Sequence, residues 1–305
     1  MLRAALALGV VLLAAGCGGG GKKAVATGPS LFAYERSAPL GYRDRGRVNH
    51  GYPVQVRDVS YAGPRGGLVH AYLVVPPGKG PFPAVLYLHG SGEDRTSLVV
   101  PAAWLVARGA VALALDSAFV GASGPEPADP VRRLERERDL TADTVVDLRR
   151  GVDVLASLPQ VDPKRLGFVG YSSGAKIGAI LAGIEPRIRA YDLMSGGSAP
   201  VSSFVAAAPR GLRGPIGRVL DQIDPLRFVR RAGPSALFFQ DGLDDTVVPR
   251  AQLAALAAAG SEPKRIRWYR ADHDLDAQAF RDQLAWLSRE LAIRGPEVKG
   301  ARTGP

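Results

Sequence analysis

Short apolar runs that alternate with helical stretches are the feature of this sequence that most limits its fold. The run Pro83–Leu88 is apolar almost throughout and ends in His89-Gly90, as expected for a strand buried on both faces. Alternation at this spacing predicts an α/β protein with a mostly parallel central sheet and helices on both faces. The expected strands are Val54–Tyr61, Leu68–Val75, Pro83–Leu88, Ala110–Leu115, Arg165–Val169, Ile188–Met194, Ala236–Gln240 and Arg265–Tyr269, and the expected helices are Val99–Arg108, Leu140–Leu158, Gly174–Gly183, Ala251–Ala259 and Ala277–Ile293.

One pentapeptide carries the pattern G-x-S-x-G, and it reads Gly170-Tyr171-Ser172-Ser173-Gly174. In a chain with 37 glycines the pattern alone is weak. Here it directly follows an apolar strand and directly precedes a helix, which is the context of a nucleophile elbow. A turn tight enough to lift a serine above the sheet leaves no room for a Cβ atom two residues to either side. The glycines therefore select Ser172 as the nucleophile; the alternative is a glycine-rich turn that happens to hold serine.

A serine hydroxyl needs a general base near pH 7, and the chain offers four histidines. His50 and His70 lie upstream, in an entry segment and a hairpin, where a surface or packing role is expected. His89 lies in the turn that ends a strand. Only His273, just past the last expected strand, satisfies the chain order serine, aspartate, histidine. We predict that His273 is the general base.

The catalytic histidine in turn needs a carboxylate that fixes its tautomer and stabilises the imidazolium. Asp241, Asp244 and Asp245 follow the expected strand Ala236–Gln240. The sequence from Gly242 onward resembles a G-x-x-D-x-x-V-P signature that many hydrolases carry, and this signature selects Asp245. Asp244 is the alternative acid. If it is not the acid, its side chain is expected to cap a helix or a turn.

Acyl transfer also needs hydrogen-bond donors for the tetrahedral oxyanion, each worth about 3 kcal/mol. The backbone N–H of Ser173, immediately after the nucleophile, is the first expected donor. The second is the backbone N–H of Ser91, in the loop His89-Gly90-Ser91-Gly92, where glycines allow the backbone to approach a substrate. We predict an oxyanion hole made of these two groups.

The stretch Val161–Gly174, together with the His89-Gly90 loop, Asp245 and His273, resembles the dienelactone-hydrolase-like and prolyl-oligopeptidase-like branches of the α/β-hydrolase superfamily. The resemblance runs from about Val54 to Leu291. It implies the α/β-hydrolase fold, a serine hydrolase activity and a structural role for His89.

Neither branch's specificity follows from this resemblance. Dienelactone hydrolases use a cysteine where this chain has Ser172, so lactone specificity is not implied. Prolyl-oligopeptidase relatives carry a β-propeller before the hydrolase domain, and the residues before Val54 leave no room for one. A peptidase is therefore the weaker expectation.

The first residues resemble a bacterial export signal. Met1-Leu2-Arg3 supplies a positive start, and Ala4–Ala15 is an apolar run too short to span a bilayer as a helix. The run leads into Gly16-Cys17, which resembles a lipobox, and Cys17 is the only cysteine of the chain. We predict lipidation at Cys17; the alternative is an ordinary secretory signal with an incidental cysteine.

The sequence therefore predicts four segments. Residues 1–16 form a lipoprotein signal peptide, 17–45 hold the lipidated cysteine and a flexible tether, 46–293 form the α/β-hydrolase domain and 294–305 form a loose tail. Lipidation would place the protein on the extracytoplasmic face of a membrane.

Two insertions are expected on the side of the sheet where the strands end. The first, Ser117–Arg138, finishes in the charged run Arg132–Arg138, which we interpret as a solvated helix face, with a substrate clamp as the alternative. The second, Ser198–Leu226, is long enough for a small flap and too short for a full lid domain. A fairly open site is therefore expected.

The sequence also limits the partners. The net charge is +10, but arginine is spread along the whole chain and does not cluster, so we expect no nucleic-acid partner. We see no metal cluster, phosphate loop or dinucleotide fingerprint, and we expect no cofactor. The predicted function is that of a membrane-tethered serine esterase. The alternatives are a peptidase or amidase with the same triad and an inactive hydrolase fold that serves as a binding lipoprotein.

Overall fold

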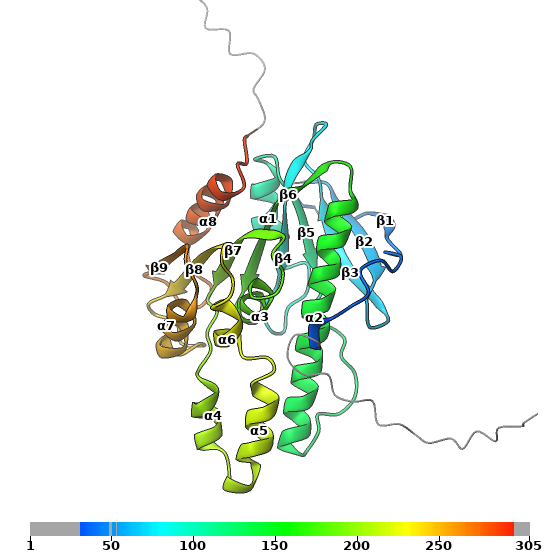
Figure 1. Ribbon diagram of the computed structural model, residues 1–305. Coiled ribbons are helices and arrows are strands. Elements are labelled where there is room, and N and C mark those ends of the chain that lie inside the picture. Colours follow the sequence, from blue (N-terminus) through cyan, green and yellow to red (C-terminus); the bar gives the residue numbers. More distant parts are fainter. Residues whose placement is uncertain (1–30, 49–50, 53, 296–305) are drawn as a thin grey trace, which may run out of the picture.

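The computed structural model describes residues 31–48, 51–52 and 54–295 (Figure 1). The predicted signal peptide, Cys17 and nearly all of the predicted tail therefore lie outside the described residues. Within the described part of the chain, no helix is both long enough and apolar enough to cross a membrane.

A twisted sheet of nine strands forms the centre of the described chain, in the order β1-β2-β3-β5-β4-β6-β7-β8-β9. At one edge of the sheet, β1, β2, β3 and β5 each run antiparallel to the next strand. The strands β5, β4, β6, β7, β8 and β9 all run parallel to one another. This is the mostly parallel sheet that the alternation of apolar runs predicts. The strands are β1 Arg43–Arg47, β2 Val56–Ala62, β3 Leu68–Val74, β4 Phe82–Leu88, β5 Val111–Leu115, β6 Val161–Tyr171, β7 Ile188–Met194, β8 Ala236–Gly242 and β9 Lys264–Tyr269.

Two layers of helices cover the sheet (Figure 1). The helices α1 and α8 share one hydrophobic cluster with the sheet, and α2, α3, α6 and α7 share the other. Because β4 and β5 lie between the two layers, nearly all of their residues are buried. The helices are α1 Val99–Val106, α2 Pro130–Ser157, α3 Ser173–Ala182, α4 Val201–Ala207, α5 Arg213–Leu220, α6 Pro225–Val229, α7 Arg250–Ala259 and α8 Ala277–Glu290, with a 3-10 turn at Arg210–Leu212.

The long helix α2 begins ten residues before the expected start at Leu140. Asp129 caps it by accepting a hydrogen bond from the backbone N–H of Arg132 at 2.8 Å, and Pro130 occupies the first turn. The charged run Arg132–Arg138 is therefore the first part of a helix, and the loop of this insertion is confined to residues 117–129. The charges obscured this start because they interrupt the apolar periodicity.

The second insertion forms a helical arm. Its helices α4 and α5 extend away from the sheet beside the N-terminal half of α2 (Figure 1). No residue of α4 is buried, and Phe204 is 46% exposed. The arm returns to the body through α6, whose Phe228 is buried. The expected small flap is thus present as a pair of short helices.

The segment before β2 packs against the domain and is not a tether. Leu31 and Phe32 are buried at 5% and 1% exposure, and the Phe32 ring meets the Phe228 ring edge-on with centroids 5.4 Å apart. Residues 43–47 then add the edge strand β1 to the sheet. The expected tether over 17–45 is therefore wrong for residues 31–45, which belong to the domain; the remainder of that range lies outside the described residues.

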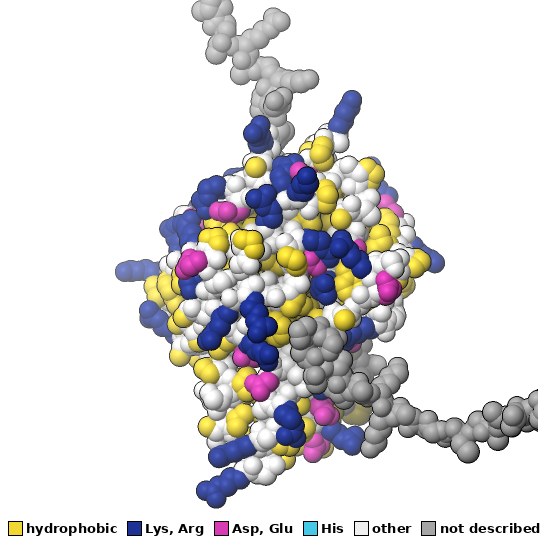
Figure 2. Space-filling model, in the orientation of Figure 1, with side chains coloured by type: hydrophobic (Ala, Val, Ile, Leu, Met, Phe, Trp, Pro, Cys, Tyr) yellow, Lys and Arg dark blue, Asp and Glu magenta, His cyan; other side chains and the backbone are white. Residues whose placement is uncertain are grey.

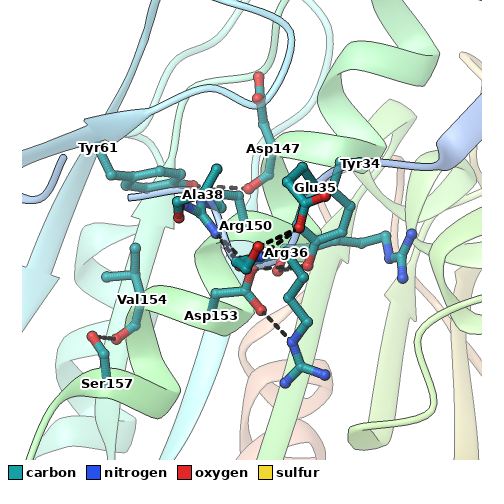
Figure 3. A network of polar contacts seen from close by, with 12 residues as sticks. Tyr34, Glu35, Arg36, Ala38, Tyr61, Asp147, Arg150, Asp153, Val154 and Ser157 are labelled. Atoms are coloured by element: carbon teal, nitrogen blue, oxygen red, sulfur yellow. Dashed lines mark hydrogen bonds and ion pairs between the residues drawn. The ribbon is translucent and has the colours of Figure 1, made fainter. Parts of the chain in front are cut away.

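A polar network centred on Asp153 of α2 holds the same segment (Figure 3). The Asp153 carboxylate accepts from the Tyr34 hydroxyl at 2.8 Å and from Arg150 at 3.1 Å, and it pairs with Arg36 at 3.4 Å. Arg187, the residue before β7, pairs with Asp153 Oδ1 at 2.6 Å, the same oxygen that Arg36 contacts. Several donors on one nearly buried carboxylate compensate for its desolvation and fix the segment across α2.

Basic side chains are scattered over the visible face of the molecule (Figure 2). They lie among apolar and uncharged groups, and no single dense cluster stands out. This distribution agrees with the interpretation of the net charge of +10 as solvated surface.

Candidate active site

Ser172 lies at the tip of a sharp turn between β6 and α3. Its backbone has φ 54° and ψ −116°, outside the ordinary helix and strand regions. A Cβ atom on Gly170 would come within 2.5 Å of the Gly174 carbonyl oxygen, and one on Gly174 within 2.6 Å of the His89 carbonyl oxygen. The flanking glycines are therefore required by space, as the sequence pattern predicts, and the turn presents the side chain of Ser172 beyond the sheet.

The side chains of Ser172, His273 and Asp245 form one hydrogen-bonded chain. His273 Nε2 lies 2.9 Å from Ser172 Oγ, and His273 Nδ1 lies 2.8 Å from Asp245 Oδ2. The three residues follow the carboxyl ends of β6, β9 and β8, which meet at the same edge of a parallel sheet. The structure thus brings together the three residues selected from the sequence.

The environment of Asp245 decides the tautomer of the histidine. Its Oδ1 atom accepts hydrogen bonds from the backbone N–H groups of Val247 and Val248, both at 2.8 Å. These donors hold the carboxylate, whose side chain is only 1% exposed, facing His273. The carboxylate then accepts the proton on His273 Nδ1, which leaves Nε2 free to accept the proton of Ser172.

Asp244, the alternative acid, does not contact His273. Its backbone N–H donates to the Ala271 carbonyl at 3.0 Å, which ties the acid loop to the histidine loop. Asp241, the remaining candidate, is buried on β8. The geometry therefore favours Asp245 among the three aspartates.

The other described histidines are engaged elsewhere. His89 is buried, and its Nε2 accepts from the Ser117 backbone N–H at 3.1 Å. Its Nδ1 must then carry the proton that is shared with the Gly90 carbonyl at 2.7 Å, so the ring pins the β4–α1 loop to the β5–α2 loop. His70 contacts Arg45 at 3.2 Å near the sheet edge. His50 lies outside the described residues.

A cavity with a volume of about 800 Å³ opens beside the nucleophile. Ser91 and Ser173, the two expected oxyanion donors, both line it. Neither backbone N–H donates a hydrogen bond to another group in the described part of the chain. Gly90, just before Ser91, is held by its own N–H donating to Glu93 at 2.9 Å. Both N–H groups are therefore available to a bound oxygen atom.

The cavity has an apolar and a polar side. Its apolar part is formed by Ile177 and Ile180 of α3, by Ile223 at the base of the helical arm, and by Phe119 and Val120 of the first insertion. Hydroxyl and carboxylate side chains line the remainder, and an ion pair of 3.6 Å joins Lys176 to Glu137 at this wall. Glu137 belongs to the charged run of the first insertion, so one member of that run does face the cavity.

Two side chains missed in the sequence hold the backbone beside His273, the predicted base. The Ser195 hydroxyl donates to the His273 carbonyl at 2.7 Å. The Tyr171 hydroxyl donates to Asp274 Oδ1 at 2.7 Å, and its ring lies 5.3 Å from the His273 ring. Tyr171 lies inside the G-x-S-x-G pattern, at a position where the pattern allows any residue. Ser195 is a single serine after an apolar strand, and the sequence gives no indication of its role.

Two carboxyl groups are buried in the strands below the site. Burial raises the pKa of Asp241 to about 8, and the nearby charge of Asp245 adds to this shift. Burial also raises the pKa of Asp192, on β7, to about 8; the Gln283 amide opposes the shift and Asp241 reinforces it. Both carboxyls are therefore protonated at neutral pH. No group of three or more His, Cys, Asp or Glu side chains is placed to hold a metal ion among the residues described.

Comparisons with known proteins agree with this geometry. The sequence profile of the acetyl xylan esterase family matches residues 46–194, a little under half of the chain. Esterase FrsA of Salmonella paratyphi B is 29% identical over 158 residues, which cover 51% of this chain and 35% of that protein. The same protein of Salmonella newport matches equally well. The match thus spans about a third of the length of these relatives.

Solved structures extend the likeness to most of the chain. Acetyl xylan esterase 1 from Thermoanaerobacterium sp. has a TM-score of 0.67 at 21% identity, covering 86% of this chain and 91% of that chain. An acetyl xylan esterase from Paenibacillus sp. has a TM-score of 0.68 at 20% identity, covering 83% and 89%. At this identity the likeness shows the fold. The chain has the α/β-hydrolase fold, and its sequence likenesses are to esterases.

Proposed function

We propose that this protein is a serine hydrolase of carboxylic esters. The observation that carries the proposal is the continuous hydrogen-bonded chain from Ser172 Oγ through the His273 ring to the Asp245 carboxylate, with steps of 2.9 Å and 2.8 Å. A nucleophile, a base and a group that orients the base are thus within hydrogen-bond reach. The likeness to esterases supports an ester as the substrate in preference to an amide.

In the acylation step, Ser172 Oγ attacks the carbonyl carbon of the ester while its proton passes to His273 Nε2. The carbonyl oxygen becomes an oxyanion that the N–H groups of Ser173 and Ser91 stabilise. Asp245 stabilises the imidazolium by accepting from Nδ1. The tetrahedral intermediate collapses when His273 donates its proton to the leaving alcohol, which gives an acyl-enzyme on Ser172.

Deacylation repeats the sequence with water. His273 Nε2 takes a proton from the water as the oxygen attacks the acyl carbon, and the same N–H groups bind the second oxyanion. The proton then returns to Ser172 Oγ as the C–O bond breaks and the carboxylic acid leaves. The balance requires only an ester and one water molecule, and every proton moves through His273.

The test compares the full chain with its Ser172→Ala variant on p-nitrophenyl acetate, butyrate and octanoate, together with labelling by a fluorophosphonate. The proposal expects turnover and labelling of the wild type and loss of both in Ser172→Ala, with turnover reduced by up to about 10⁶-fold. Ser173→Ala is the matched control, because it keeps the backbone N–H and removes only a neighbouring hydroxyl. A wild type that neither labels nor hydrolyses any of the three esters would refute the proposal.

We further propose that Cys17 is lipidated and tethers the enzyme to the extracytoplasmic face of a membrane. The support is in the sequence alone, in the apolar run Ala4–Ala15 followed by the single cysteine. A Cys17→Ala variant should move from the membrane fraction to the soluble fraction and fail to incorporate a labelled fatty acid. Equal partition of the two forms would contradict this proposal without affecting the proposed chemistry.

A further inference from the structure

The end of strand β7 carries no member of the predicted triad, yet it contacts the backbone of two of them. The Met194 carbonyl accepts the N–H of Ser172 at 2.8 Å. The next residue, Ser195, donates its hydroxyl proton to the carbonyl of His273 at 2.7 Å. Two consecutive residues of one strand end therefore hold the nucleophile and the base.

Ser195 is well suited to act as a fixed support. Its exposed fraction is 0%, and its N–H donates to the Gln240 carbonyl of β8 at 2.8 Å. A Cβ atom on the following Gly196 would come within 2.5 Å of the Ala175 Cβ atom, so the backbone is pressed against α3. The hydroxyl is thus aimed by a backbone that cannot move away.

The backbone of Ser195 is itself in an uncommon conformation. Its φ of +52° lies in the left-handed region, which a serine occupies only at a cost in free energy. Glycine would adopt the same φ freely. The presence of serine at such a position calls for a contribution from its side chain, and the one hydrogen bond that this side chain makes in the described structure is to His273.

His273 needs such a support because it lies in a turn between β9 and α8, and no sheet ladder fixes its backbone. Its carbonyl accepts from Ser195 Oγ at 2.7 Å and, at the longer distance of 3.4 Å, from the Tyr171 hydroxyl. A shift of this carbonyl moves the ring relative to Ser172 Oγ, and misplacement of a reacting group by about 1 Å can cost about 100-fold in rate.

We propose that Ser195 is a positioning residue for the catalytic histidine: its hydroxyl, together with the Met194 carbonyl, sets the distance between the base and the nucleophile. The inference rests on the proposed function, in which His273 is the base. Ser195 touches neither the substrate nor the reacting atoms, and it acts through the backbone of His273 alone.

The experiment uses Ser195→Gly, Ser195→Ala and Ser195→Cys in the full chain. Ser195→Gly removes the hydroxyl and relieves the strained φ, so folding is retained while the support is lost. We expect kcat and the rate of fluorophosphonate labelling to fall about ten- to a hundredfold in the glycine and alanine variants, with KM within twofold of the wild type. Ser195→Cys, which keeps a weak donor, should recover part of the loss.

Ser198→Ala is the matched control. Ser198 is a buried serine of the same connection, 6% exposed, and its hydroxyl contacts only the neighbouring Ala199 carbonyl at 3.4 Å. Its removal should leave kcat unchanged. Wild-type kcat in a folded Ser195→Gly would overturn the inference, and so would an equal loss of kcat in Ser198→Ala.

A second readout does not depend on turnover. The proton between His273 Nδ1 and Asp245 gives a low-field proton resonance, which should shift or broaden in Ser195→Gly and stay in place in Ser198→Ala. An unchanged resonance in Ser195→Gly would also overturn the inference. Failure of the proposed function is distinguishable, since it would appear as a wild type without labelling or ester turnover.

Discussion

Tyr171, the residue before Ser172, hydrogen-bonds Asp274, the residue after His273, with 2.7 Å between the hydroxyl and Oδ1. The hydrogen bond joins the turn that carries Ser172 to the turn that carries His273. It adds to the support that Ser195 gives to the same turn. Two hydrogen bonds besides that between Ser172 and His273 therefore hold the His273 turn in place.

Removal of the tyrosine hydroxyl should slow the enzyme without unfolding it. A net hydrogen bond of this kind is worth about 1 kcal/mol, so Tyr171→Phe should lower kcat/KM about fivefold. Asp274→Asn is the control, because the amide keeps an oxygen that can accept from Tyr171. Ester kinetics on both variants test this, and a loss in Asp274→Asn as large as in Tyr171→Phe would point to charge in place of the hydrogen bond.

The two adjacent aspartates should differ sharply. Asp245→Asn keeps the acceptor for the backbone N–H groups of Val247 and Val248 but disturbs the tautomer of His273, and kcat should fall by about 10⁴-fold. Asp244→Asn leaves every hydrogen bond of the triad in place and should stay within about twofold of the wild type. Comparable losses of kcat in the two variants would show that the negative charge of the loop matters more than the contact with His273.

The glycines that flank Ser172 should be intolerant of substitution. A Cβ atom at position 170 would lie 2.5 Å from the Gly174 carbonyl oxygen, so Gly170→Ala must displace backbone and should cost about 3 kcal/mol or more in the free energy of unfolding. Gly211, in the helical arm, has open space around its Cβ position, and Gly211→Ala should be neutral. Urea unfolding of both variants provides the measurement; a Gly170→Ala protein of wild-type stability would contradict the crowded turn.

Stability should fall as the pH rises from about 4 to about 8 because of the buried carboxyls. The pKa of Asp192 in the folded protein is raised to about 8, while in the unfolded chain it is near its ordinary value of 3.8. Between these values the folded state holds a proton that the unfolded state has lost. The free energy of unfolding therefore decreases as pH rises through this window, by up to about 1.4 kcal/mol per pH unit for each such group.

Asn in place of Asp192 removes this ionisation. Asp192→Asn should flatten the dependence of the urea midpoint on pH between about 4 and 8 and should change it little above about pH 8. Asp241, whose pKa is also raised to about 8, should keep part of the dependence, and the double variant should remove more of it. Curves for wild type and variants that run parallel over this range would contradict the prediction.

The three predicted catalytic residues could be identified from the sequence because their chemistry requires particular residues at particular places in the chain. Two glycines mark Ser172, chain order singles out His273, and a loop signature separates Asp245 from Asp244. The structure places all three in contact. The residues that hold the predicted triad in place have no sequence pattern of their own. The orientation of a hydroxyl such as that of Ser195 depends on packing between distant parts of the chain and not on neighbouring residues.

Two of the elements that the sequence missed are polar ones. Strand β1 reads Arg43–Arg47, is mostly exposed, and exists because it pairs with β2 at the sheet edge. The first turns of α2 carry seven residues of charge and leucine, Arg132–Arg138, without an apolar stripe. Both form through tertiary pairing or capping, which override weak local preferences.

The packing of Leu31 and Phe32 has a practical consequence for protein engineering. The likeness to the acetyl xylan esterase family begins at residue 46, yet Leu31 and Phe32 are already buried in the domain. An expression boundary drawn from similarity would bare the Phe228 ring to solvent and remove Tyr34 and Arg36 from Asp153. Such a truncated protein would expose an apolar patch next to Arg149 and Arg150, which would lose their backbone carbonyl partners in the removed segment. Aggregation of that product would therefore give no information about its catalytic activity.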